Sequence, residues 1–361
     1  MPKSSISLLI IACAFAFQRP TAPAANSAVS IADAFATGWM LTDTNADGIA
    51  DFVNGKIIVP ARPSAAENAA AANLAGRVGF GTTGLTLPIV VNVAASVSDG
   101  PRIWVGKDAV PARLSAELAA VTPKLEAEEG GVLALSGNLV VVANDDRGLT
   151  VAADAYAARA PYQWRVPGDK LDAIASAVGS GTQLVGVTYK RGIAGVYRAI
   201  LRSQTPVTIA ALSAAFASNH LTGVRQVTVL GGMSPVEVMN PKTLPAETPT
   251  AAGSQAGGGP PAPKRLDLAT LYTSRGLFTG TARMPIPSSL DAHLYVPAGA
   301  AGTALANLAA RMGMEATGLT LPLASPAPDA AVKDVRSQAV IAGDSALSKE
   351  AEMKLREQSR H

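Results

Sequence analysis

The chain has 361 residues, of which 48% are hydrophobic, 4% aromatic and 16% charged, with a formal net charge of +3 at pH 7. A chain of this length can form two or three domains, each with its own core. The small net charge and the lack of a dense basic segment argue against nucleic-acid binding.

The N-terminal residues predict export. Lys3 precedes a short apolar run from Ile6 to Phe17, and small residues follow, with Ala22-Pro23-Ala24 as a cleavage site. This order is typical of a secretory signal peptide over residues 1–24, because the apolar run is too short to span a bilayer as a helix. Two alternatives remain for Cys13: ordinary cleavage beyond it, or a lipid anchor at a lipobox-like sequence. We therefore expect a periplasmic, cell-surface or extracellular protein that contacts the membrane only through a lipid at Cys13.

An oxygen-rich segment at residues 43–51 follows. Side-chain oxygens recur on alternate residues, a glycine permits a tight turn, and one backbone carbonyl completes the set of Asp43, Asn45, Asp47, Ile49 and Asp51. Such a set suits a hard cation such as Ca²⁺. The segment resembles the calcium loops of thrombospondin type 3 and dockerin repeats, which implies Ca²⁺ as a cofactor. The alternative is an Asx-rich turn whose side chains accept hydrogen bonds from backbone amides.

The first α/β module is predicted over residues 31–175. A strand at 55–60 leads to a capping box at Ser64 and Glu67. An Ala-rich helix then runs to about Val78, and Gly79 is expected to end it in a left-handed turn. The further elements are strands at 85–91 and 102–105, a helix from Pro111 to about 125, strands at 132–135 and 139–143, and a helix at 149–160. This alternation predicts an α/β sandwich with a largely parallel sheet.

The middle of the chain has a different pattern. Residues 182–232 predict a small α+β unit, with strands at 184–189, 194–202 and 224–230 and a helix at 207–219. Residues 233–265 are rich in Pro, Gly and Ala and poor in large apolar residues, so we expect a linker there.

The last third of the chain repeats the first module. NLAGRVGFGTTGLTLP at 73–88 recurs as NLAARMGMEATGLTLP at 307–322, and Leu271-Tyr272 echoes Ala34-Phe35. We therefore expect duplicated α/β modules whose helices at 64–78 and 301–312 superpose. The second module, 266–361, ends in a charged helix at 348–358 and lacks a counterpart to residues 131–164. Either it is a minimal version of the module, or the chain is a fragment of a longer protein.

Residues able to carry catalysis are few. His220, His293 and His361 have no partner at metal-ligand spacing. Carboxylates gather at Glu126, Glu128 and Glu129 and at Asp145 and Asp146, where a solvated turn is the simpler interpretation. A basic and aromatic group is either an anion-binding face or the wet side of a sheet; it consists of Tyr189, Lys190, Arg191, Tyr197, Arg198 and Arg202. We expect no enzymatic activity from these sets.

The order of motifs in residues 53–164 carries a second resemblance. In chain order these motifs are Val59-Pro60, Asn73-Leu74-Ala75, Leu85-Thr86-Leu87-Pro88, Val105-Gly106, Glu128-Glu129-Gly130-Gly131, Leu139-Val140-Val141-Val142 and Asp146-Arg147-Gly148. The order resembles the non-catalytic β/α domain before the barrel of family 20 and family 67 glycoside hydrolases. It is also similar to the α/β modules of the periplasmic subunit of cellulose synthase.

This resemblance implies a function without assigning catalytic residues, because the module carries none in either family. Together with the predicted signal peptide and the lack of a catalytic set, it predicts an exported, non-enzymatic envelope protein with a carbohydrate-related scaffold or binding role, and with a polysaccharide or an envelope protein as partner. The alternative is the N-terminal fragment of a larger secreted enzyme, such as a glycosidase, whose catalytic domain lies outside this chain.

Overall fold

The computed structural model describes residues 30–96, 99–159, 171–179, 181–217, 224–231, 235–240, 269, 271–273, 276–281, 284–290, 292–327 and 339–341. The predicted signal peptide with Cys13, most of the predicted linker, His220, His361 and the helix expected at 348–358 lie outside the described residues.

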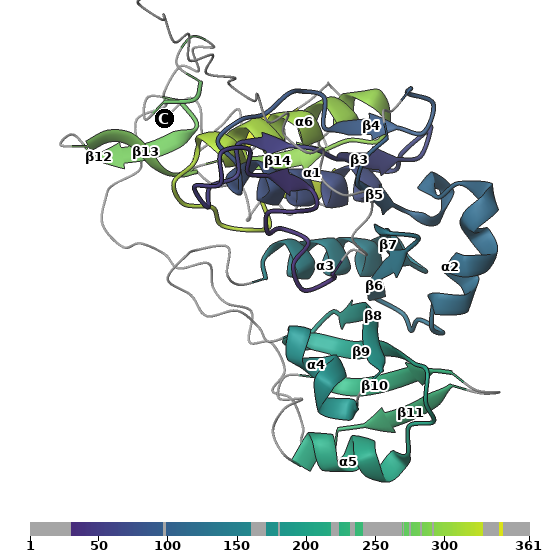
Figure 1. The fold of residues 1–361 in the computed structure, drawn as a ribbon. Coiled ribbons are helices and arrows are strands. Elements are labelled where there is room, and N and C mark those ends of the chain that lie inside the picture. Colours follow the sequence, from purple (N-terminus) through teal and green to yellow (C-terminus); the bar gives the residue numbers. More distant parts are fainter. Residues whose placement is uncertain are drawn as a thin grey trace, which may run out of the picture.

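A nine-stranded sheet runs through the first two thirds of the chain in the order β11-β10-β9-β8-β6-β7-β5-β3-β4 (Figure 1). Its strands are β3 (Lys56–Val59), β4 (Val90–Asn92), β5 (Arg102–Val105), β6 (Glu129–Leu135), β7 (Asn138–Ala143), β8 (Thr182–Lys190), β9 (Val196–Ser203), β10 (Val224–Leu230) and β11 (Val236–Met239). The α/β class predicted from the sequence is therefore confirmed.

The sheet is mixed, whereas the sequence predicts a largely parallel one. Strands β4, β3, β5 and β7 are parallel. The hairpin between β7 and β6 turns at Ser136 and Gly137, both at positive φ, and reverses the direction of β6. Strand β8 then pairs antiparallel with β6, so the segment 182–232 continues the sheet of the first module. Strand β11 adds a further antiparallel edge inside the predicted linker, and that part of the prediction is wrong.

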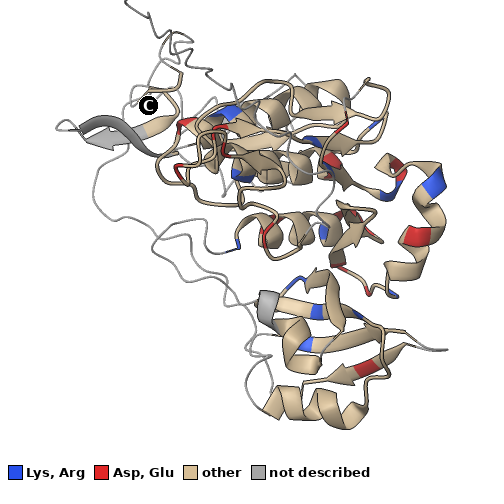
Figure 2. Cartoon of the chain, viewed as in Figure 1, with Lys and Arg blue, Asp and Glu red and all other residues tan. Residues whose placement is uncertain are grey.

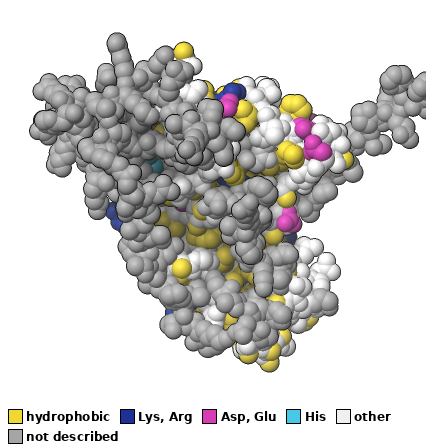
Figure 3. Space-filling model, turned by 90° about the vertical axis from the view of Figure 1, so that its left-hand side faces the viewer, with side chains coloured by type: hydrophobic (Ala, Val, Ile, Leu, Met, Phe, Trp, Pro, Cys, Tyr) yellow, Lys and Arg dark blue, Asp and Glu magenta, His cyan; other side chains and the backbone are white. Residues whose placement is uncertain are grey.

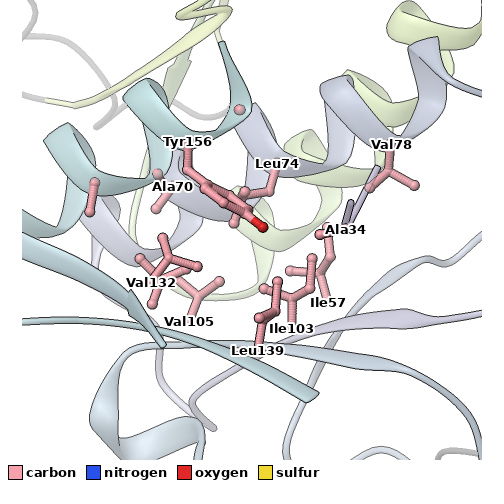
Figure 4. Packing of buried hydrophobic residues seen from close by; sticks show 14 of the residues in the cluster. Ala34, Ile57, Ala70, Leu74, Val78, Ile103, Val105, Val132, Leu139 and Tyr156 are labelled. Carbon is pink, nitrogen blue, oxygen red and sulfur yellow. The ribbon is translucent and has the colours of Figure 1, made fainter. Parts of the chain in front are cut away.

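Helices cover both faces of this sheet. Helices α1 (Ala65–Phe80) and α3 (Asp146–Ala157) pack on one face, where Tyr156 lies between Leu74 and the strand residues Val105 and Val132 (Figure 4). Helix α2 (Ser115–Val121), preceded by the short helices η1 (Lys107–Ala109) and η2 (Ala112–Leu114), covers the opposite face around Trp104. The unit formed by β8–β11 carries α4 (Leu171–Val178) and α5 (Ile209–Ala217). Burial of both faces explains the continuous apolar runs of the central strands.

The start of α1 matches the prediction and its end does not. The Ser64 hydroxyl accepts from the Glu67 amide at 3.1 Å, and the Glu67 carboxylate accepts from the Ser64 amide at 2.8 Å, which confirms the capping box. The helix then continues past Gly79 to Phe80 and is capped at Gly81, with φ −86°. Gly79 is therefore not a left-handed terminator. Because Gly79 has no side chain, the backbone of another helix can approach it closely.

Two further boundaries differ from the prediction. Helix α2 ends at Val121, earlier than expected, because Pro123 has no amide to continue the helix. Residues 85–89 were expected as strand but form a loop, and β4 begins only at Val90, where the backbone amide is bound by the side chain of Asn307.

The second copy forms a smaller, similar arrangement. It contains β12 (Phe278–Thr281), β13 (Met284–Leu290), β14 (His293–Val296), α6 (Gly299–Glu315), β15 (Ala324–Pro326) and β16 (Ala339–Ile341). The parallel order β15-β14-β16 matches β4-β3-β5. Leu294 pairs with Ala324 and Val340, as the aligned Ile57 pairs with Val90 and Ile103. In each copy an arginine also lies over an aromatic ring, Arg77 over Phe35 and Arg311 over Tyr272.

Helices α1 and α6 lie side by side and tie the two copies together (Figure 1). The Asn73 side chain on α1 accepts from the Leu323 and Ala324 amides, both at 2.8 Å, and donates to the Ala324 carbonyl at 2.9 Å. Asn307, the aligned residue on α6, makes the equivalent hydrogen bonds to the first copy. It accepts from the Ile89 and Val90 amides at 2.8 and 2.9 Å and donates to the Val90 carbonyl at 2.8 Å. We call these two sets of bonds the asparagine exchange.

Candidate functional site

The oxygen-rich segment forms an exposed loop between two short strands, β1 (Leu41–Thr42) and β2 (Phe52–Val53). The carboxylates of this loop accept hydrogen bonds from backbone amides. Asp43 accepts from the amides of Asn45, Ala46 and Gly48 at 3.3, 2.7 and 2.8 Å. Asp47 accepts from the Ile49 amide at 2.8 Å and from the Asn45 carboxamide at 3.1 Å. The side chains expected to bind a cation are therefore brought into one loop, and each faces an N–H group of that loop.

The last carboxylate of the loop is held by Thr44. Asp51 accepts from the Thr44 amide at 2.7 Å and also from its hydroxyl. The hydroxyl and then the amide lower the pKa of Asp51, so this group stays ionised at neutral pH. The donor set fits Ca²⁺ in kind, since it offers carboxylate and carboxamide oxygens. In the part of the chain that the structure describes, no group of three or more His, Cys, Asp or Glu side chains is placed around a common metal position.

The second copy shows what the same length of chain does without acidic residues. Leu41 pairs with Val53, and the aligned Phe278 pairs with Leu290, so the two segments span the same number of residues. In the second copy that span is filled by the strands β12 and β13. In the first copy the pairing of β1 with β2 stops after Thr42. The backbone amides of the residues between the strands donate to side chains of the same loop. The acidic loop is therefore present at 43–51 and is replaced by paired strands in the aligned segment.

The second candidate set, Glu126, Glu128 and Glu129, meets basic residues of β8 and β9, which are blue in Figure 2. It also meets the aromatic Tyr197 of β9. Pairing of β6 with β8 brings these groups together from positions about sixty residues apart in sequence. Glu129 is fully buried and accepts from the Arg198 Nε at 2.7 Å and the Thr188 hydroxyl at 2.6 Å. We call this set of ion pairs the β6–β9 ion-pair cluster.

The other glutamates of the β6–β9 ion-pair cluster are more exposed than Glu129 but are also paired. Glu126 accepts from Arg198 at 2.8 Å and from the Tyr197 hydroxyl at 3.0 Å, and it also pairs with Lys190. The hydrogen bond to Lys190 lowers the pKa of Glu126, and the same bond raises the pKa of Lys190. A general acid requires a carboxyl with a raised pKa, so this cluster has the properties of a structural ion-pair network. Glu128 pairs with Arg147 and Arg191 at 2.9 and 3.3 Å, in the same manner.

The remaining candidate residues that the structure describes form no ion pair with the glutamates of this cluster, although Asp145 accepts from the Glu128 backbone amide at 2.9 Å. Arg202 is exposed near the far end of β9, and Tyr189 is buried beside Gly130. Asp145 caps α3 by accepting from the Gly148 amide at 2.7 Å. His293 is partly buried on β14, with its Nε2 2.8 Å from the Ser325 hydroxyl. Among the described residues visible in Figure 3, acidic side chains stand in small separate groups.

The carboxylate of Glu67 lies at the carboxyl edge of the parallel strands, and no motif in the sequence indicates a function for it. Open α/β sheets bind ligands where the strand order reverses, which here falls between β3 and β5. Glu67 lies at that edge, and a side chain on Gly106 would come within 2.2 Å of its carboxylate. Burial raises the pKa of Glu67, and the charges of Asp108 and Asp146 raise it further. The sequence predicted only the position of Glu67 in a capping box. Its contacts with Gly106, Asp108 and Asp146 depend on how the strands and helices are arranged in space.

Comparisons of the chain with protein-family models, with curated proteins and with solved structures found no match. No helix in the described ranges is long and apolar enough to cross a membrane. The resemblances to the glycoside hydrolase domain, to the cellulose synthase subunit and to calcium-binding repeats therefore stay predictions.

Proposed function

We propose that this chain is an exported, non-enzymatic envelope protein that acts as a scaffold built from two copies of one α/β module. The observation that carries this proposal is the asparagine exchange. Asn73 is fully buried, and the backbone groups that it binds in the second copy belong to residues that are 1% and 2% exposed. A protein whose task is to hold partners at a fixed spacing needs such a fixed relation between its units.

The two copies support the proposed duplication through matched details. The strand order, the pairing register, the paired asparagines and the arginine over an aromatic ring all recur at aligned positions. Unrelated segments that happen to share an α/β pattern have no reason to share these contacts. The ion pairs of Glu126 and Glu129 further favour a structural role for the carboxylates of the first copy.

The scaffold is tested by measuring the distance between the copies. Arg113 and Ala304 are exposed, one beside α2 and the other on α6, and cysteines introduced there can carry spin labels once Cys13 is replaced by Ala. We expect a single narrow distance distribution by pulsed electron resonance. A broad distribution would mean that the copies move independently, and would overturn the scaffold.

The export and partner proposals have separate tests. Protein recovered from the native envelope should lack its first residues on N-terminal sequencing, and an intact Met1 on cytoplasmic protein would contradict export. The purified mature chain should co-sediment with insoluble envelope polysaccharide, with purified peptidoglycan and cellulose as the probes. If it stays in solution with both probes, the carbohydrate role is lost and an envelope protein remains as the partner.

We also propose that the loop at 43–51 binds Ca²⁺ through Asp43, Asn45, Asp47, Asp51 and the Ile49 carbonyl. The proposal is supported by the low pKa of Asp51 and by the difference from the β12–β13 hairpin of equal span. The carboxylates repel each other without an ion, so the bound ion would stabilise the approach to β2.

Removal of calcium tests this proposal. Binding at a hundredfold excess over the dissociation constant stabilises a fold by about 2.7 kcal/mol. We expect EDTA to lower the melting temperature of the wild type, and Asp47→Ala to abolish that difference. Asp33→Ala, an exposed aspartate outside the loop, is the matched control and should keep it. Absence of both calcium heat in calorimetry and an EDTA effect at millimolar ion would show that the loop is only a turn.

A further inference from the structure

The centre of the contact between α1 and α6 is symmetric. A side chain on Gly79 would lie 2.0 Å from the Ala310 carbonyl oxygen, and a side chain on Gly313 would lie 2.1 Å from the Gly76 carbonyl oxygen. In the alignment of the repeats, Gly79 corresponds to Gly313 and Gly76 to Ala310. Each helix therefore presents the same small surface to the other. This part of the contact, together with the asparagine exchange, would suit two first modules as well as it suits a first and a second module.

The N-terminal end of the same contact is not symmetric. Asn68 on α1 is fully buried and reaches into the first turn of α6, where it donates to the carbonyls of Pro297 and Gly299, both at 2.9 Å. It also accepts from the Thr303 hydroxyl at 3.1 Å. The residue aligned with Asn68 is Gly302. A side chain at Gly302 would come within 2.3 Å of the Asn68 carboxamide, so the asparagine fills a space that glycine leaves open.

The loop before α6 makes this fit specific to the second copy. Between the aligned prolines Pro60 and Pro297 and the helices that follow, the second copy is three residues shorter than the first. The shorter loop places the Pro297 carbonyl over Gly302, 1.9 Å from where a side chain would begin. The first copy has the longer loop and Asn68 at the aligned position. Two first modules would therefore bring Asn68 against Asn68 at this end of the contact.

We propose that Asn68 and Gly302 form a knob and hole that restricts the pairing surface of the first module to a second module, and prevents first modules of different chains from pairing with each other. This inference rests on the proposed scaffold of paired modules. Its partner is defined by chemistry: an α/β module with the asparagine of the exchange, small residues at the helix crossing, and glycine at the position aligned with Asn68.

The test uses the full chain. Gly302→Leu should expel Asn68 and separate the copies. The amides of Val90 and Ala324 should then exchange with deuterium about a hundredfold faster, as expected when a buried contact is lost. This variant should stay monomeric in sedimentation velocity, because Asn68 still blocks first modules from pairing. Slow exchange at Ala199, in the core of β9, is the control for an intact first module.

The double variant Asn68→Gly/Gly302→Leu distinguishes the knob and hole from a simple loss of packing between the copies. It should dimerise, and the Val90 amide should regain its protection through Asn73 of the second molecule, while the Ala324 amide stays exposed. A dimer of Gly302→Leu alone, or a monomeric double variant without renewed protection at Val90, would overturn the inference. Misfolding of the second module does not affect this comparison, because only first modules pair. Fast exchange at both amides in the wild type would instead refute the paired scaffold itself.

Discussion

Removal of the Asn73 side chain should destabilise the whole chain, because one carboxamide serves three backbone groups of the other copy. Asn73→Ala leaves the Leu323 and Ala324 amides and the Ala324 carbonyl without partners. These residues are 1% and 2% exposed, so water does not replace the lost bonds without local opening. A buried group left unsatisfied costs about 1–3 kcal/mol. Asn73 also donates to the Asp154 carboxylate at 2.6 Å, so four groups lose a partner. With partial relaxation, we expect a loss of about 3–6 kcal/mol.

The assay is guanidinium unfolding followed by circular dichroism at 222 nm. Asn307→Ala provides a comparison, since Asn307 binds the aligned groups but is itself partly exposed. It should cost less, about 2–3 kcal/mol, because water can take up part of the lost bonding. Asn54→Ala, at an exposed asparagine, is the control and should change stability by no more than about 0.5 kcal/mol. If Asn73→Ala behaves like Asn54→Ala, the asparagine exchange does not hold the copies together.

Three further predictions concern single side chains. Burial of its carboxyl raises the pKa of Asp154 from 3.8 to about 7, so folding takes up a proton. The free energy of unfolding should therefore fall as pH rises from about 4 to about 7, by at most about 1.4 kcal/mol per pH unit. Asp154→Asn should remove that slope in pH-dependent melting. Arg198→Met leaves the buried Glu129 uncompensated and should cost about 3–5 kcal/mol in chemical unfolding, whereas Arg202→Met, exposed on the same strand, should cost about 0.5 kcal/mol or less. Gly79→Ala should lower the melting temperature by several degrees, because the added methyl would overlap a backbone oxygen of α6; an unchanged melting temperature would contradict the close crossing.

The local features of the fold were predictable from the sequence. Ser64 and Glu67 form a capping box as their spacing predicts, because both partners lie within one turn of helix. The apolar runs at β3, β5 and β7 predict strands because burial on both faces requires apolar residues throughout. These interactions join neighbours in sequence, so their residues can be recognised without the tertiary structure.

The interactions between distant segments were not predictable in the same way. Asn73 lies in an Ala-rich helix, and nothing beside it indicates partners 250 and 251 residues away. Gly79 has the position of a helix terminator, and its real role depends on a carbonyl of α6. The sequence around Glu129 predicts a solvated turn, because the cation that pairs with it, Arg198, arrives only through the pairing of β6, β8 and β9. Register between strands, which sequence pattern specifies only weakly here, decides these contacts.

The asparagine exchange also has a consequence for the order in which the chain is made. Each carboxamide occupies the outer N–H and C=O of an edge strand, where a further strand would otherwise add. Strand β4 is synthesised early, but Asn307 follows it by 217 residues, so its edge stays open while most of the chain is still being produced. A first module that folds during synthesis would expose the unpaired backbone N–H and C=O groups of this edge strand to other nascent chains. Folding only after the whole chain is available would let Asn307 cover the edge of β4, and Asn73 the edge of β15, as soon as these strands form.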